Sequence, residues 1–124
     1  MWCENKITIN GKFDEILNIL NSKKICFLFK RFFPEIESGN GFTYRMMFGC
    51  KRDVYMIDVL HIIKEEKLIL SFETSYTPCI SFCEKISKKF NVHLKLEYFD
   101  SEIIGKFIFD KGVMIFKEKR KNEA

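Results

Sequence analysis

Residues 77–98 read TPCISFCEKISKKFNVHLKLEY, a helix signal that is followed at once by a strand signal. Thr77 suits the position before a helix and Pro78 its first turn. A threonine hydroxyl can cap free amides, and proline lacks the amide hydrogen that would be left unpaired there. Apolar side chains then recur at helical spacing from Phe82 to Phe90. From Val92 to Tyr98 apolar and polar side chains alternate, so the stretch predicts a helix ending near residue 91 and then a half-buried strand.

The same patterns extend in both directions from this unit. The predicted elements are a strand at 4–10, a helix at 12–22, two strands at 53–63 and 67–74, and a closing hairpin at 103–109 and 113–116. Strand, helix, two strands, helix and strand is the split βαβ order. The chain is therefore predicted to be α+β, a ferredoxin-like sandwich with two helices on one face of an antiparallel sheet, plus a C-terminal β-hairpin.

The domain boundaries follow from what this pattern leaves over. Residues 23–50 fit none of the elements of the split βαβ order and do not belong to the hairpin. We expect them to form an insertion packed on the core. Residues 1–116 are then a single ferredoxin-like domain. Residues 117–124 carry half of the net charge of +4 and are predicted to be a basic C-terminal tail outside it.

Composition limits the possible classes of protein. With 124 residues, 47% of them apolar and 31% charged, the chain is long enough for one compact domain. The odd number of cysteines, five, together with an N-terminus that lacks a basic leader and a long apolar stretch, predicts free thiols in the cytoplasm. No apolar run approaches 18 residues, so no membrane span is expected.

Two motifs resemble a known family. Trp2-Cys3-Glu4-Asn5 leads into the first strand, and residues 72–78 read Phe-Glu-Thr-Ser-Tyr-Thr-Pro before the second helix. They are similar to the Trp-Cys-x-Asn start and the Phe-Asp-Thr-Ala-Trp-Ser-Pro signature of the YubB-type ferredoxin-like proteins of plasmids, phages and genomic islands. Residues 48–53 resemble that family's Trp-Gly-Thr-Lys-Trp segment, with Phe48 and Arg52 where tryptophans are usual, and Tyr76 likewise replaces a Trp. The resemblance covers residues 1–22 and about 48–116 and implies a fold and a mobile-element setting, not a reaction.

Aromatic rings are concentrated between residues 27 and 33. They form either a second core under the insertion or an exposed patch of aromatic and basic side chains that binds a partner. For a partner, the contact residues would be Phe29, Lys30, Arg31, Phe32 and Phe33.

The family motifs suggest a second candidate site. Trp2, Phe48 and Tyr76 are predicted to converge into a small pocket near Glu73, with plain packing at the sheet edge as the alternative.

Catalytic and metal chemistry find little support in the residues. Cys79 and Cys83 share one helix face, and zinc would need further ligands such as His61 and His93, but core filling is favoured because free cysteine behaves as a small hydrophobe. The chain has no nucleophile elbow and no glycine-rich phosphate loop. We therefore expect no catalytic residue, no metal and no cofactor.

Nucleic-acid binding is a second possibility. The strand residues predicted to face away from the helices show no aromatic ladder, which argues against base stacking of the RRM kind. Contact with a nucleic-acid backbone would use the tail residues Lys117, Lys119, Arg120 and Lys121.

We expect a non-enzymatic protein of a mobile genetic element that binds a macromolecule. Its most specific form is an antagonist of a host protein or ribonucleoprotein, such as a nucleic-acid-guided, CRISPR-type defence effector. The alternatives are a nucleic-acid-binding accessory protein and a small-molecule or enzymatic pocket near Trp2, Glu73 and Tyr76.

Overall fold

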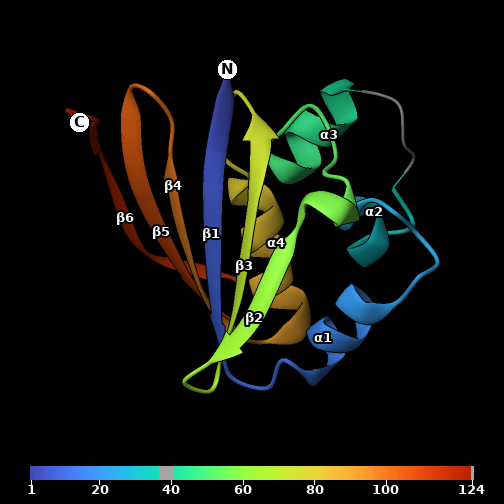
Figure 1. Cartoon of the computed structure of the whole chain (residues 1–124). Helices are drawn as coiled ribbons and strands as arrows, with labels where there is room; N and C mark the ends of the chain where they lie inside the picture. Colours follow the sequence, from blue (N-terminus) through green and yellow to red (C-terminus); the bar gives the residue numbers. More distant parts are fainter. Residues whose placement is uncertain (37–40, 124) are drawn as a thin grey trace.

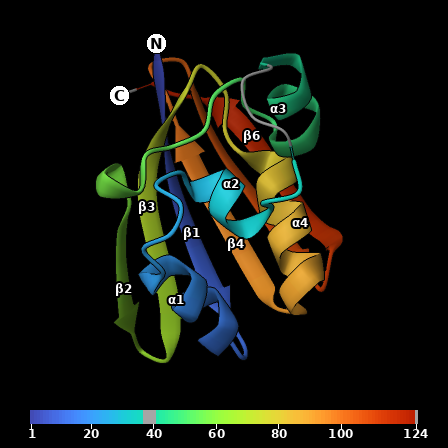
Figure 2. The same ribbon diagram turned by 90° about the vertical axis from the view of Figure 1, so that its right-hand side faces the viewer.

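The computed structural model describes residues 1–36 and 41–123, which form a sheet with helices packed on one face (Figures 1 and 2). The sheet is six-stranded in the order β2-β3-β1-β4-β5-β6, and every neighbouring pair is antiparallel. The elements are β1 (Trp2–Asn10), α1 (Asp14–Asn21), α2 (Leu28–Phe32), α3 (Gly41–Phe48), the 3-10 turn η1 (Met56–Asp58), β2 (Leu60–Lys64), β3 (Lys67–Ser75), α4 (Ile80–Phe90), β4 (His93–Phe99), β5 (Ile103–Asp110) and β6 (Val113–Lys121). This confirms the predicted α+β, ferredoxin-like architecture.

The helix and strand predicted over residues 77–98 are α4 and β4, but the predicted cap is wrong. Asn91 ends α4 in the left-handed conformation, where asparagine is tolerated. The residue before the helix is Cys79, and no side chain caps it. Thr77 instead donates its hydroxyl to the carbonyl of Gly49 at 2.7 Å, so it joins two segments distant in sequence.

The predicted strand at 53–63 is shorter than expected. Strand β2 begins only at Leu60, and the residues before it pair with the insertion. The amide of Leu28 donates to the carbonyl of Val54 at 2.8 Å, and that of Met56 donates to Cys26 at 2.7 Å. Local propensity favoured a strand here, but these long-range backbone bonds hold the segment against α2 instead.

Residues 23–50 pack on the core, as predicted, although residues 37–40 lie outside the described part of the chain. The segment supplies α2 and α3, which lie beside α4 on the helix side of the sheet (Figure 2). Phe29 and Phe48 are fully buried against Phe82 of α4, with ring centroids 4.5 and 6.0 Å away. The aromatic run is thus a second layer of core.

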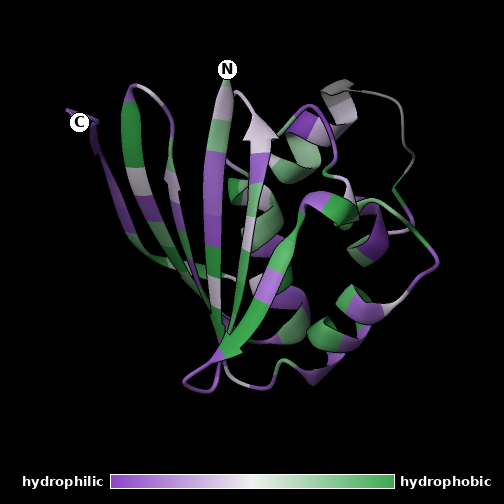
Figure 3. Ribbon diagram, viewed as in Figure 1, coloured by the Kyte–Doolittle hydropathy of each residue, from purple (hydrophilic) through white to green (hydrophobic). Residues whose placement is uncertain are grey.

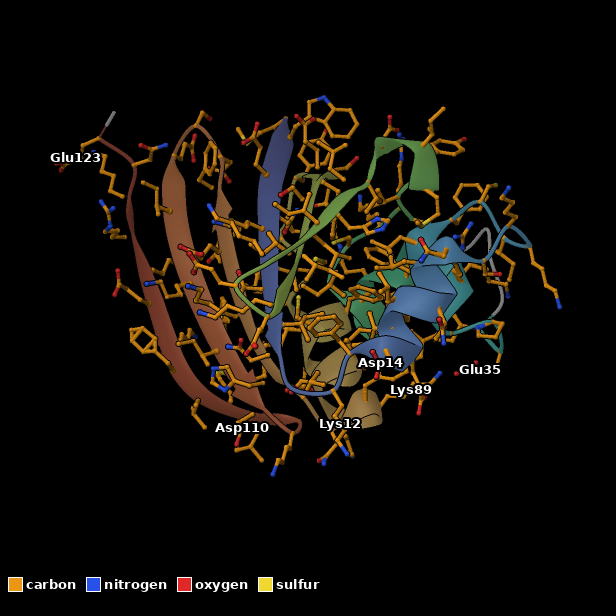
Figure 4. All side chains as sticks on the ribbon, turned by 60° about the horizontal axis from the view of Figure 1, so that its bottom comes forward. Lys12, Asp14, Glu35, Lys89, Asp110 and Glu123 are labelled. Atoms are coloured by element: carbon orange, nitrogen blue, oxygen red, sulfur yellow. The ribbon has the colours of Figure 1, made fainter. Side chains whose placement is uncertain are left out.

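The basic tail predicted at 117–124 is wrong for residues 117–121. They belong to β6, which pairs with β5 along its length, from Asp110 opposite Val113 to Ile103 opposite Lys121. Figure 3 shows β6 as largely hydrophilic towards its end, and Figure 4 places Asp110 and Glu123 at opposite ends of this hairpin. An edge strand tolerates such charges because only one of its sides is paired. None of the described helices is long and apolar enough to cross a membrane.

Candidate functional site

The face of the sheet that points away from the helices, here called the open face, is concave. Side chains of β1, β3, β4, β5 and β6 and of the segment before β2 line a hollow of about 1080 Å³. Alternation places the even-numbered residues of β1 and the odd-numbered residues of β3 on this face, while Ile7, Ile9 and Leu70 point into the core. The hollow is the candidate functional site.

One row of charges across the open face is balanced within the sheet. Lys6 lies opposite Glu97, Glu97 opposite Lys106, and Lys106 opposite Glu118, so signs alternate from β1 to β6. Glu97 also lies 3.5 Å from the Lys95 ammonium. Opposite charges on facing residues stabilise neighbouring strands, and this row therefore has a structural explanation.

The next row is not balanced. Glu4 of β1 lies directly opposite Glu73 of β3 and, on its other side, opposite Phe99 of β4. Among residues 1–36 and 41–123, no Lys, Arg or His nitrogen lies within 4.0 Å of either carboxylate. Like charges that face each other across two strands destabilise the fold, so this pair has no evident structural benefit.

Exposed aromatic rings border this carboxylate pair. Trp2 is 61% exposed, Phe99 48% and Tyr55 57%, and all three line the hollow. The Phe27 ring holds Tyr55 in place at a centroid distance of 4.9 Å. We call Trp2, Glu4, Glu73 and Phe99 the acidic end of the open face. It combines large apolar surfaces with uncompensated negative charge.

The pocket predicted around Trp2, Phe48, Glu73 and Tyr76 is assembled only in part. Trp2 and Glu73 do line the hollow. Phe48 is buried in the helix layer beside Phe29, and the prediction for it is wrong. Tyr76 donates its amide to the Met1 carbonyl at 3.1 Å, but it is not among the residues that line the hollow. A small-molecule pocket built from all four residues is therefore contradicted.

The exposed partner patch predicted at residues 29–33 is also wrong. Phe29, Phe32 and Phe33 belong to the core. The Arg31 guanidinium donates to the carbonyls of Ile25 and Leu20, and the Lys30 ammonium donates to those of Pro34 and Ile36. Arg31 thus joins the insertion to the end of α1, and Lys30 binds carbonyls of the residues that follow α2.

The polar motif residues Asn5, Thr74 and Thr77 form a buried joint, whereas Trp2 and Glu73 of the same motifs line the hollow. Asn5, 3% exposed, donates to the Thr74 hydroxyl at 2.9 Å, which donates to the Thr77 carbonyl at 2.6 Å. The Thr77 hydroxyl continues the chain of bonds to Gly49. Gly49 has a φ of +88°, and a side chain there would press on the Pro78 carbonyl. The three motif segments therefore meet in one hydrogen-bonded joint between the sheet and α4.

The thiols beside this joint are not poised for chemistry. Burial raises the pKa of Cys3 to about 12, and it also raises the pKa values of Cys50 and Cys79 well above the ordinary range. All three are protonated at neutral pH, whereas a thiol attacks or binds a metal as the thiolate. Within the described residues no group of three His, Cys, Asp or Glu side chains could hold a metal ion.

Sequence reasoning missed Phe99 and Tyr55. The alternation predicted from Val92 to Tyr98 continues for one more residue, and Phe99 lies on the same face as Glu97, so the signal was present. Tyr55 gave no such signal, because it lies in the irregular segment before β2 and reaches the hollow through backbone bonds to the insertion.

The comparisons with known proteins bear on the fold. Residues 55–124, more than half of the chain, match the model of the ferredoxin-like domain in Api92-like proteins. The crystal structure of the protein Api92 from Yersinia pseudotuberculosis is similar at 17% identity and a TM-score of 0.57. The similarity covers 71% of this chain and 32% of that one, so this chain spans about a third of the solved protein. No curated protein matches the sequence. The chain belongs to the family of ferredoxin-like domains found in Api92-like proteins.

Proposed function

We propose that this domain binds another macromolecule through the open face of its sheet, without catalysis. One observation carries the proposal: the helices leave this face uncovered (Figure 1), and its hollow exposes Trp2, Tyr55 and Phe99. Large rings have much apolar area to bury on binding and are enriched among the residues that contribute most to affinity. Cys3 and Cys50 are buried and present no thiol on the open face.

The finer form of the proposal concerns the partner. We propose a host protein or ribonucleoprotein in the cytoplasm, with the chain acting as an antagonist of a nucleic-acid-guided defence effector. The resemblance of the two motifs to YubB-type proteins of plasmids and phages supports this setting. The open face would provide the contact whether the partner is a protein or a ribonucleoprotein.

Removing two of the exposed rings is expected to abolish partner binding. Tagged wild type and the Trp2→Ala/Phe99→Ala variant would be used for affinity capture from host lysate, with and without nuclease. We expect a specific protein to be retained by wild type and lost by the variant, because hot-spot rings contribute about 2 kcal/mol or more each.

The control variant is Met46→Ala, which removes an exposed apolar side chain from α3 on the opposite side of the sheet. It should retain the same protein as wild type. Equal capture by the double variant and wild type would contradict the proposal. Loss of all capture on nuclease treatment would favour nucleic acid as the direct partner.

A nucleic-acid contact is the second candidate, and β6 is the observation that favours it. Lys117, Lys119 and Lys121 alternate along β6 on the side away from the open face, since Arg120 and Glu118 line the hollow. Alternate residues of a strand are about 6.6 Å apart. The three lysines thus form a regular basic stripe on an ordered strand, not a free tail.

The stripe is expected to contribute to nucleic-acid affinity only if this second candidate is right. Binding to single-stranded RNA would be measured against salt for wild type and for Lys119→Gln/Lys121→Gln. The salt slope should fall by about 0.7 for each phosphate that a lysine no longer neutralises. Lys23→Gln/Lys24→Gln, exposed in the loop after α1, is the matched control. If both variants behave like wild type, β6 does not bind nucleic acid.

A further inference from the structure

We infer that the acidic end of the open face selects a protein segment bearing lysine or arginine side chains. This inference rests on the proposed function and names the chemistry of the partner. It combines three observations: the charge of the hollow, the position of the rings, and the cost of the glutamate pair to the fold.

The hollow is negative in a protein that is positive. Six carboxylates and four cationic side chains line it, while the whole chain carries a net charge of +4. In the row from Lys6 to Glu118 each charged side chain faces one of opposite sign on the neighbouring strand. Outside that row the hollow is lined by the carboxylates Glu4, Glu73, Asp53 and Asp58 and by the cations Arg52 and Arg120. Asp53 is bound to backbone amides at the start of α2, and Glu4 and Glu73 face each other without a cation within 4.0 Å among the described side chains. A cationic partner group would supply the missing charge.

Two exposed aromatic residues lie beside the position that a cation between Glu4 and Glu73 would occupy. Trp2 precedes Glu4 on the same face of β1, and Phe99 lies opposite Glu4 on β4. A guanidinium or ammonium group gains from contact with an aromatic face as well as from a carboxylate, and arginine can engage both because it is planar. Tyr55 closes the β2 side of the same hollow. Rings and carboxylates together suit a basic side chain with its apolar stem better than a phosphate, which the glutamates would repel.

The glutamate pair gives the inference a test that separates binding from stability. Because facing like charges oppose folding, Glu73→Gln should raise the melting temperature or leave it unchanged. If Glu73 also binds a cation, the same substitution should weaken binding. A residue with only a structural role would not change the two measurements in opposite directions.

The experiment uses Trp2, the sole tryptophan of the chain, as the reporter. An acetylated and amidated Arg-Gly-Arg-Gly-Arg peptide is titrated into the full chain while tryptophan emission is recorded. We expect a saturable change in emission that weakens as salt is raised, because exposed charges are screened. The Glu4→Gln/Glu73→Gln variant should bind the peptide about tenfold more weakly with an unchanged or higher melting temperature.

The controls fix the interpretation. A Glu-Gly-Glu-Gly-Glu peptide should give no saturable change. Glu84→Gln removes an exposed carboxylate of α4, on the other face of the sheet, and should bind as wild type does. Equal affinity of wild type and the double glutamine variant would overturn the inference, as would saturable binding of the acidic peptide or of single-stranded RNA at the same site. The proposed function would survive these results if Trp2→Ala/Phe99→Ala still abolished capture of the partner, so the two can fail separately.

Discussion

Replacing Phe82 with alanine is expected to lower the free energy of unfolding by about 3–5 kcal/mol. Phe82 projects from α4 into the insertion, and its ring centroid lies 4.5 Å from that of Phe29 and about 6 Å from those of Phe32, Phe33 and Phe48. The side chain is 2% exposed. Its removal leaves a cavity that rings held on separate helices cannot fill without moving their backbones. Urea denaturation followed by circular dichroism measures the change.

A matched truncation on the surface tests whether the effect comes from this position. Phe116→Ala removes the same ring from β6, where it is 37% exposed. We expect a loss of about 1 kcal/mol or less there, as for substitutions away from the core. If the two variants lose the same stability, the insertion does not share a core with α4.

The framework of the fold could be predicted because its signals are local. In α4 and β4 the change from helical spacing to strict alternation occurs within residues 77–98. The polarity of each side chain there indicates whether it faces the core or solvent. In β1 and β3 buried residues such as Ile7, Leu68 and Phe72 likewise alternate with exposed ones, which is the pattern that predicted these strands. Periodicity needs no knowledge of distant residues, so these elements were predicted correctly.

The insertion and the last strand could not be predicted in the same way. Helix α2 has only five residues and begins where the carboxylate of Asp53, far along the chain, meets its amides. Strand β6 continues to Lys121 because β5 offers it a partner, although its own residues from Lys117 onward are typical of a solvated tail. In both cases interactions remote in sequence determine the structure.

The candidate site was likewise predicted where local motifs define it and missed where contacts remote in sequence define it. The family motifs placed Trp2 near Glu73, and the strand register adds Glu4 and Phe99. The aromatic run at 29–33 left core and exposed patch open as alternatives, because composition cannot tell a ring that faces solvent from one that faces another ring. A buried cluster and an exposed hot spot use the same residue types.

Replacing Asp53 with alanine is expected to lower the free energy of unfolding by about 3 kcal/mol. Its carboxylate accepts the amides of Phe29 at 2.7 Å, Lys30 at 2.9 Å and Val54 at 2.8 Å. Burial raises the pKa of Asp53, and these three bonds act in the opposite direction. Without the carboxylate, amides at the start of α2 would be partly buried with no acceptor, and the bridge between the insertion and the segment before β2 would be broken.

Two further variants separate this bridge from a general effect of charge. Asp53→Asn keeps an oxygen that can accept from Phe29 and Val54 but turns a donor towards the Lys30 amide, so we expect it to recover only part of the loss. Asp58→Ala removes an exposed carboxylate five residues along the chain and should change stability by about 0.5 kcal/mol or less. If Asp53→Ala destabilised the protein no more than Asp58→Ala, the carboxylate would not be the element that fixes α2, and backbone pairing of residues 26–28 with 54–56 would have to suffice.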